Sequence, residues 1–194
     1  MALEPVTLEG RLVTLEPLSL RHHEALCRVA LDPGLWRWTW TGVKTPQDLR
    51  HYIDKALLEF AAGVSLPFAI VHRAEGRAVG STRFGNVALA HRRVEIGWSW
   101  LGRDYQRTGA NAEAKRLLLG HAFERLGCGR VEFKTDALNA PSRGALEKLG
   151  ARFEGIFRKH GVTDEGRVRD TAWYSITDDE WPAVKARLEA RLGA

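Results

Sequence analysis

The chain has 194 residues, a net charge of +5 and a sequence pI near 9.5. This length suits one domain with a substantial core, so we expect a single domain over residues 1–194. No apolar run approaches the roughly 18 residues that a membrane-spanning helix needs, so we expect no membrane partner. The start of the chain lacks a secretory signal, and the two cysteines show no metal-ligand spacing. These features indicate a cytoplasmic protein.

The basic charge suits either an anionic cofactor or nucleic acid. The arginines are spread along the chain and form no dense run, which favours an ordinary solvated surface. We therefore expect no specific nucleic-acid partner. The seven histidines do not cluster with carboxylates or cysteines in the sequence, so no metal site is expected either.

Apolar periodicity and turn residues divide the chain into alternating strands and helices. The first strand is expected over 6–15 with a turn at Gly10, and helices capped by Ser19 and Thr45 follow it. Later strands are expected over 66–72, 78–85, 94–101, 131–135, 151–159 and 168–176. Later helices are expected over 110–126 and 139–150, with a last one starting between 177 and 179. This order predicts an α/β fold whose mixed sheet has parallel pairing only where a helix intervenes.

The strand over residues 94–101 carries a candidate catalytic carboxylate. Alternation would place on one face Val94, Ile96, Trp98 and Trp100, and on the other Glu95, Gly97, Ser99 and Leu101. Glu95 then shares its face with two small residues, where a ligand can approach closely. The alternative is a surface carboxylate paired with Arg92, Arg93 or another basic neighbour, and the spacing alone leaves both interpretations open.

The loop and helix start over residues 105–114 form a candidate phosphate site. Unpaired N–H groups and the helix dipole favour a phosphate at such a position. Gly109 permits close backbone approach, and Arg107 adds positive charge. Neither a Walker loop nor a dinucleotide fingerprint is present.

The motifs over residues 106–114 and 139–151 resemble those of the GNAT N-acetyltransferase superfamily, particularly its RimJ/RimL-like branch. QRTGAN at 106–111 stands where the superfamily has Gln/Arg-x-x-Gly-x-Gly/Ala, and AEA at 112–114 is similar to the branch's Thr-Glu-Ala. NAPS at 139–142 and EKLGA at 147–151 resemble its Asn-x-x-Ser…Glu-Lys-x-Gly-Phe pattern. Asn111 departs from the usual small residue. The resemblance covers nearly the whole chain and implies an acyl-CoA N-acyltransferase fold with a splayed central sheet.

The resemblance implies acetyl-CoA as the acyl donor and assigns contacts to it. The pyrophosphate would be held by the backbone amides of Gln106, Arg107, Thr108, Gly109, Ala110 and Asn111. The pantetheine arm would pair with the backbone of Trp98, Ser99, Trp100 and Leu101, where two neighbouring strands splay apart. Asn139 would hydrogen-bond this arm or shape the loop beside the thioester. Ser142 would lie near the sulfur, where it could donate a proton to the leaving thiolate. Local sequence equally allows Asn139 to be a helix cap and Ser142 an ordinary first-turn residue.

An amine attacks a thioester only when it is deprotonated, and Glu95 is the candidate general base. A backbone N–H near Trp98 is a candidate donor to the developing oxyanion. Neither cysteine lies in a nucleophile motif, so direct transfer in a ternary complex is expected. Trp36, Trp38 and Trp40 would share one face if their segment were extended, where they either clamp the acceptor or simply pack.

The acceptor expected from the resemblance is the N-terminal α-amine of a protein, such as a ribosomal protein. The alternatives are a small amine (polyamine, amino acid or amine antibiotic) and a non-catalytic acyl-CoA-binding module. Glu95, Asn139 and Ser142 together argue against the last. GNAT proteins often pair, so a homodimer is also expected.

Overall fold

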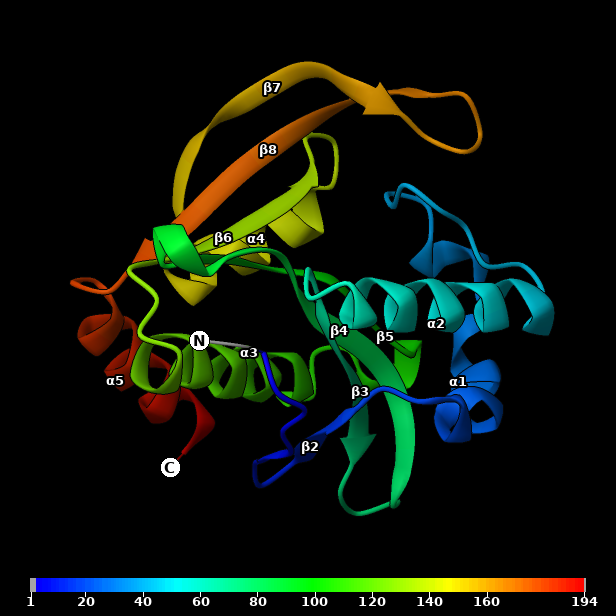
Figure 1. The fold of residues 1–194 in the computed structure, drawn as a ribbon, viewed down its shortest axis with the longest axis horizontal. Helices are drawn as coiled ribbons and strands as arrows, with labels where there is room; N and C mark the ends of the chain where they lie inside the picture. Colours follow the sequence, from blue (N-terminus) through cyan, green and yellow to red (C-terminus); the bar gives the residue numbers. More distant parts are fainter. Residues whose placement is uncertain (1–2, 194) are drawn as a thin grey trace.

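The computed structural model describes residues 3–193 and has one eight-stranded mixed sheet. Its strand order is β1-β2-β3-β4-β5-β6-β8-β7, and every pairing is antiparallel except that of β5 with β6 (Figure 1). The strands are β1 (Leu8–Glu9), β2 (Val13–Pro17), β3 (Leu66–His72), β4 (Arg77–Ala88), β5 (Arg93–Leu101), β6 (Arg130–Asp136), β7 (Arg152–Val162) and β8 (Val168–Thr177). The expected mixed α/β sheet with one parallel step is confirmed.

The helices agree with the expected order and differ in detail. They are α1 (His23–Ala30), α2 (Pro46–Ala61), α3 (Ala110–Gly120), α4 (Ala140–Leu149) and α5 (Trp181–Leu192). Thr45 caps α2, because its side chain accepts a hydrogen bond from the Asp48 N–H at 3.1 Å. The expected helix over 110–126 changes its winding, since α3 continues as a π-helix from His121 to Arg125. None of the described helices is long and apolar enough to cross a membrane.

The expected first strand is divided into β1 and β2 by a tight turn at Gly10. The Gly10 N–H donates to the Val13 carbonyl at 2.9 Å. The side chain of Glu113, at the start of α3, accepts bonds from the N–H groups of Arg11, Leu12 and Val13. A Cβ on Gly10 would collide with this carboxylate. The turn therefore joins β1 and β2 to α3, below the candidate phosphate loop.

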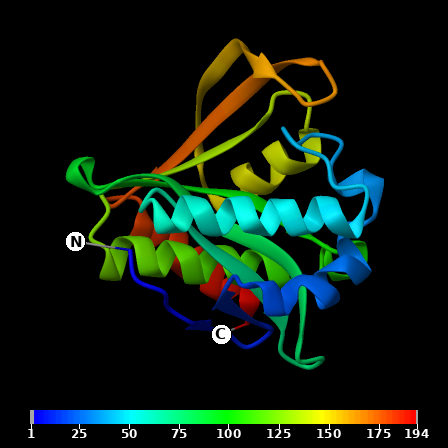
Figure 2. The same cartoon turned by 45° about the vertical axis from the view of Figure 1, so that its right-hand side comes forward.

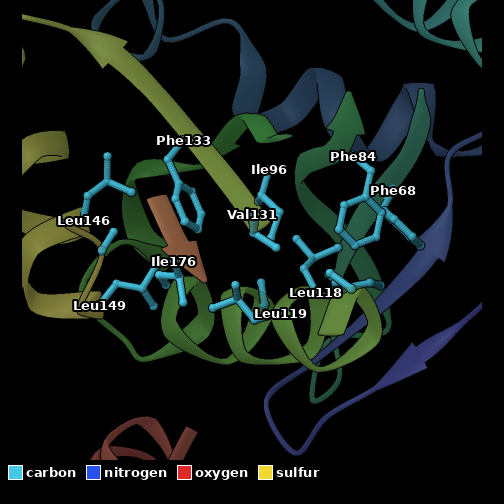
Figure 3. Packing of buried hydrophobic residues seen from close by; sticks show 14 of the residues in the cluster. Phe68, Phe84, Ile96, Leu118, Leu119, Val131, Phe133, Leu146, Leu149 and Ile176 are labelled. Atoms are coloured by element: carbon cyan, nitrogen blue, oxygen red, sulfur yellow. The ribbon is translucent and has the colours of Figure 1, made fainter. Parts of the chain in front are cut away.

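The helices cover both faces of the sheet (Figure 2). Helices α3, α4 and α5 pack on one face, where a large apolar cluster contains Leu118 and Leu119 of α3 beneath Ile96, Val131 and Phe133 of the strands (Figure 3). Helices α1 and α2 pack on the other face in a second cluster that includes Trp36 and Trp100. Each fully buried large apolar side chain contributes roughly 1.5–3 kcal/mol, so both clusters hold the sheet firmly.

The sheet divides between β5 and β6. Their parallel pairing covers only Arg93–Arg130, Val94–Val131 and Glu95–Glu132, whereas β6 remains paired with β8 along its whole length. Beyond Glu95, β5 stays with β4, and the strands β6, β8 and β7 lead away from it (Figure 1). The separation leaves backbone groups on the facing edges of β5 and β6 without strand partners. We call this region the split.

Candidate active site

A bulge in β5 changes which residues face the same way. Arg83 pairs with Gly97 and Ser81 with Trp100, so two residues of β5 oppose one residue of β4. Trp98 lies at this irregularity with a φ of 50°. The predicted alternation is therefore wrong beyond Gly97, because a bulge shifts the side-chain register by one residue. Ser99 and Leu101 lie on the α3 face, and Trp100 lies on the same face as Glu95.

Glu95 is buried at the last paired position before the split. Its side chain is 5% exposed. Two donors hold its Oε2, the Asn86 amide at 2.6 Å and the Lys134 ammonium at 2.7 Å. A Cβ on Gly97 would lie 3.0 Å from Oε1, so the absence of a side chain there leaves space beside that oxygen. Among residues 3–193, Glu95 pairs with neither Arg92 nor Arg93, and Arg93 binds Glu132 instead. The basic partner of Glu95 is Lys134, and Glu95 is buried rather than on the surface.

Further charged side chains of β6 and β8 lie on the same face of the sheet as Glu95. Asp136, 1% exposed, accepts a hydrogen bond from Arg167 and lies 3.8 Å from Arg169. Arg169 is itself 3% exposed, and burial lowers its pKa while Asp136 opposes that effect. Lys134 lies over the Trp173 ring at 4.0 Å. This face therefore carries both signs of charge, and we call the surface formed by Glu95, Lys134, Asp136, Arg167 and Arg169 the polar wall.

The three tryptophans before α2 do not share a face, because their segment turns instead of running extended. Trp36 is 8% exposed, donates to the Ala30 carbonyl at 2.7 Å and packs on Trp100 in the α1–α2 core. Trp40 lies beside the β7–β8 hairpin, under Arg169 at 4.1 Å, and Trp38 lies against Arg167 at 5.6 Å. Trp38 and Trp40 therefore border the polar wall, and Trp36 does not.

The candidate phosphate loop lies between β5 and α3. Arg107 and Gly109 both have positive φ, at 64° and 94°, and left-handed residues are typical of loops whose successive N–H groups form an anion-binding concavity. Among residues 3–193, the first-turn N–H groups of Asn111 and Ala112 have no protein acceptor. Gln106 differs from the expectation, because its N–H donates to the Arg103 carbonyl at 3.2 Å. The N–H groups left without a protein acceptor therefore lie in the later part of the loop and in the first turn of α3, where an anion is favoured.

Asn139 and Ser142 lie at the start of α4, after the end of β6. The Asn139 side chain accepts the Ser142 N–H at 3.2 Å, so Asn139 is the N-cap of α4. Both residues are partly exposed. Among the described residues, no hydrogen bond or ion pair joins either side chain to Glu95.

The sequence prediction missed Lys134, Asp136 and Arg169 on the Glu95 face, and it also missed a charged residue on the α3 side of the split. Lys115 of α3 is 7% exposed, and its ammonium donates to the Ser99 hydroxyl at 2.6 Å. Burial lowers its pKa to about 7, although the charge of Glu95 acts in the opposite direction. Helical spacing could have found it, because Lys115 precedes Leu118 and Leu119 by three and four residues on the apolar face.

No group of three or more His, Cys, Asp or Glu side chains that could hold a metal ion occurs among residues 3–193. The candidate site thus consists of the split, the candidate phosphate loop and the buried carboxylate of Glu95. Residues 12–152 match the acetyltransferase (GNAT) domain family.

This chain belongs to the GNAT acetyltransferases. It is 27% identical over 179 residues to the N-acetyltransferase p20 of Bacillus licheniformis, whose function is uncharacterised, covering 90% of this chain and 98% of that one. A GCN5-related N-acetyltransferase from Brucella melitensis is 35% identical, with a TM-score of 0.90 over 98% of this chain and 86% of that one. Mycobacterium smegmatis RimJ, solved with CoA-disulfide, is 28% identical, with a TM-score of 0.83 over 97% and 95% of the chains. This GNAT protein is therefore an acetyltransferase.

Proposed function

We propose that this enzyme moves the acetyl group of acetyl-CoA directly to the N-terminal α-amine of a protein, as in the RimJ/RimL-like branch. The 28% identity to RimJ over nearly the whole chain supports the class of acceptor. The buried carboxylate at the split supports the chemistry. A ribosomal protein is the specific acceptor that the branch favours.

The observation that carries the proposal is the unequal environment of the two Glu95 oxygens. Oε2 receives hydrogen bonds from Asn86 and Lys134, which orient the carboxylate. Oε1 faces the space over Gly97, at the edge where β5 leaves β6. An α-ammonium group placed there can lose its proton to Oε1, directly or through a water molecule. Such a base contributes about 10²–10⁴-fold to the rate.

The acetyl-CoA site that we propose lies along the freed edge of β5. The Arg107–Asn111 loop and the start of α3 would hold the pyrophosphate, and the backbone of residues 98–101 would pair with the pantetheine arm. The irregular backbone at Trp98 would place an N–H near the thioester oxygen. Asn139 would position the arm through the α4 cap, and Ser142 would protonate the leaving thiolate.

Direct transfer also agrees with the state of the two cysteines. Burial raises the pKa of Cys27, and the nearby Glu24 adds to the effect. Burial likewise raises the pKa of Cys128, which is 1% exposed in the core. The thiolate is the reactive form, so neither side chain suits an acyl-enzyme intermediate.

The charges of the polar wall favour a peptide over a polyamine acceptor. The carboxylates Glu95 and Asp136 are each matched by cations, which are Lys134, Arg167 and Arg169. A polycationic amine would meet like charges there, whereas one α-amine on a peptide chain needs only one carboxylate. Trp38 and Trp40 would contact the residues that follow the amine.

A free-thiol assay with acetyl-CoA and a panel of acceptors tests the proposal. The panel contains peptides beginning with alanine or serine, the same peptides with blocked N-termini, and small amines such as spermidine. We expect turnover only with free peptide N-termini. Turnover only with small amines would replace the proposed acceptor, and acetyl-CoA binding without any turnover would indicate a non-catalytic acyl-CoA-binding module.

A further inference from the structure

The Lys115 side chain reaches from α3 into the gap between the diverging strands. Its Nζ donates to Ser99 Oγ on β5 at 2.6 Å and lies 6.0 Å from the Phe133 ring on β6. The backbone of β5 at Ser99 is beyond the last residue that pairs with β6. Lys115 therefore places a buried amine between the two edges that the split leaves open.

This amine has fewer acceptors than it has protons to donate. A lysine ammonium carries three donors, and among residues 3–193 only Ser99 Oγ accepts one of them. Ser99 is already engaged on its other side, since Thr82 shares a hydrogen bond with it at 2.7 Å. A buried charged donor without an acceptor is strongly destabilising. Two of the three N–H donors of the Lys115 ammonium therefore have no acceptor beside β5 among residues 3–193.

We propose that Lys115 binds the pantetheine arm of CoA by donating a hydrogen bond to an amide carbonyl oxygen of that arm. This inference rests on the proposed function, because it uses the same site at the split. The candidate phosphate loop follows β5, and Glu95 lies four residues before Ser99, a separation of ~13 Å along an extended strand. Ser99 lies between the positions proposed for the pyrophosphate and for the thioester, at the level of the arm's amides.

The protonation of Lys115 agrees with this role. Burial lowers the pKa of Lys115 to about 7, and Glu95 of β5 is the charged group whose field raises it. The other groups that face the amine, Ser99, Thr82 and Phe133, are neutral. A carbonyl oxygen at Nζ favours the ammonium form. Binding of CoA should therefore draw a proton onto Lys115 near neutral pH.

Calorimetric titration of CoA and acetyl-CoA into the wild type and Lys115→Met tests the assignment. Loss of a charge-assisted hydrogen bond should raise both dissociation constants by about tenfold to a hundredfold. The two ligands should be affected equally, because the contact is to the arm and not to the thioester. The matched control is Lys148→Met, since Lys148 is an exposed lysine of α4, and it should bind as the wild type does.

The same titration, repeated in two buffers of different ionisation enthalpy, counts protons. The wild type should take up protons on binding CoA, and Lys115→Met should lose that uptake. Equal affinities and equal proton counts in the two proteins would overturn the role of Lys115 while leaving the CoA site intact. A wild type that does not bind CoA would instead overturn the proposed function.

A measurement on the wild type keeps the inference testable if Lys115→Met does not fold. In protein labelled with ¹³C-lysine, the lysine that titrates near neutral pH is expected to be Lys115. Its pKa should rise when CoA is added. An unchanged or lowered pKa in the presence of CoA would contradict the proposed hydrogen bond.

Discussion

The two faces of the sheet at the split differ sharply in polarity. On the α1–α2 face, Glu95 is held by Lys134 and Asn86, and Asp136 by two arginines. On the α3 face, Lys115 lies among apolar side chains with one hydroxyl partner. Matched partners stabilise a buried charge, whereas burial without them favours the neutral form of the group. We infer that the acceptor amine loses its proton on the α1–α2 face and that acetyl-CoA is bound from the α3 face.

The largest effect that we expect comes from Glu95→Gln. The amide cannot accept the proton of the attacking amine, so kcat should fall by about 10²–10⁴-fold with little change in acetyl-CoA affinity. Steady-state kinetics and calorimetry measure the two quantities.

Glu132→Gln is the matched control for that change. Glu132 opposes Glu95 in the register and is equally buried, at 5% exposed, but Arg93 and Arg130 bind it away from the split. The Glu132→Gln substitution should lower the melting temperature and leave kcat near the wild-type value. Equal loss of kcat in both variants would remove Glu95 from the role of base.

Lys115→Met should stabilise the folded protein in a pH-dependent manner. The unfolded lysine binds a proton up to about pH 10.4, whereas the pKa of the folded one is about 7. Wild-type stability should therefore rise with pH between these values, because the unfolded state binds more protons there. Below pH 7, the free energy of unfolding of Lys115→Met should exceed that of the wild type by on the order of a few kcal/mol. This difference should shrink at higher pH.

Urea denaturation over a pH series gives that difference directly. Lys148 is exposed, so the free energy of unfolding of Lys148→Met should differ from that of the wild type by the same amount at all pH values. A stability difference for Lys115→Met that does not vary with pH would show that the amine is not desolvated on the α3 face.

Gly109→Ala tests the proposed acetyl-CoA site by changing the backbone conformation of the candidate phosphate loop. Gly109 has a φ of 94°, and an added Cβ would lie 3.1 Å from Leu12. A left-handed conformation costs a non-glycine residue about 1–2 kcal/mol, so acetyl-CoA affinity should fall by about tenfold as the loop relaxes. Calorimetry measures the dissociation constant.

Gly127→Ala provides a comparison for backbone strain alone. Gly127 also has a positive φ, of 59°, and a Cβ there would meet nothing within 4 Å. It should lower the melting temperature without weakening acetyl-CoA binding. If both variants bound acetyl-CoA as tightly as the wild type does, the loop would not be the pyrophosphate site.

The smallest effect is expected from Trp38→Ala on the acceptor side. The Trp38 ring is proposed to contact the residues that follow the amine, so its loss should raise the acceptor KM by about threefold to tenfold. Trp36→Phe should instead reduce stability, because Trp36 is a core residue. A fall in melting temperature without a change in KM for Trp38→Ala would assign that ring to packing.

Much of the fold follows from local patterns in the sequence. Thr45, Pro46 and the apolar spacing of α2 predict that helix closely, and the helix before Gly150 ends as expected. The bulge at Trp98 could not be predicted, because it results from pairing with β4 and not from the local sequence. For the same reason, alternation placed Ser99 on the wrong face and gave no sign of its contact with Lys115. The turn over 36–40 likewise depends on packing against α2 and the β7–β8 hairpin.

Hydrogen–deuterium exchange with and without acetyl-CoA tests the central claim, that the donor binds at the split. Binding should protect the backbone amides of residues 97–101 and 107–112. The groove of about 410 Å³ between the N-terminal segment and helices α3 and α5, lined by Val6, Arg116 and Trp181, should be unaffected. Protection confined to that groove, or absent from β5 and the loop, would contradict the account.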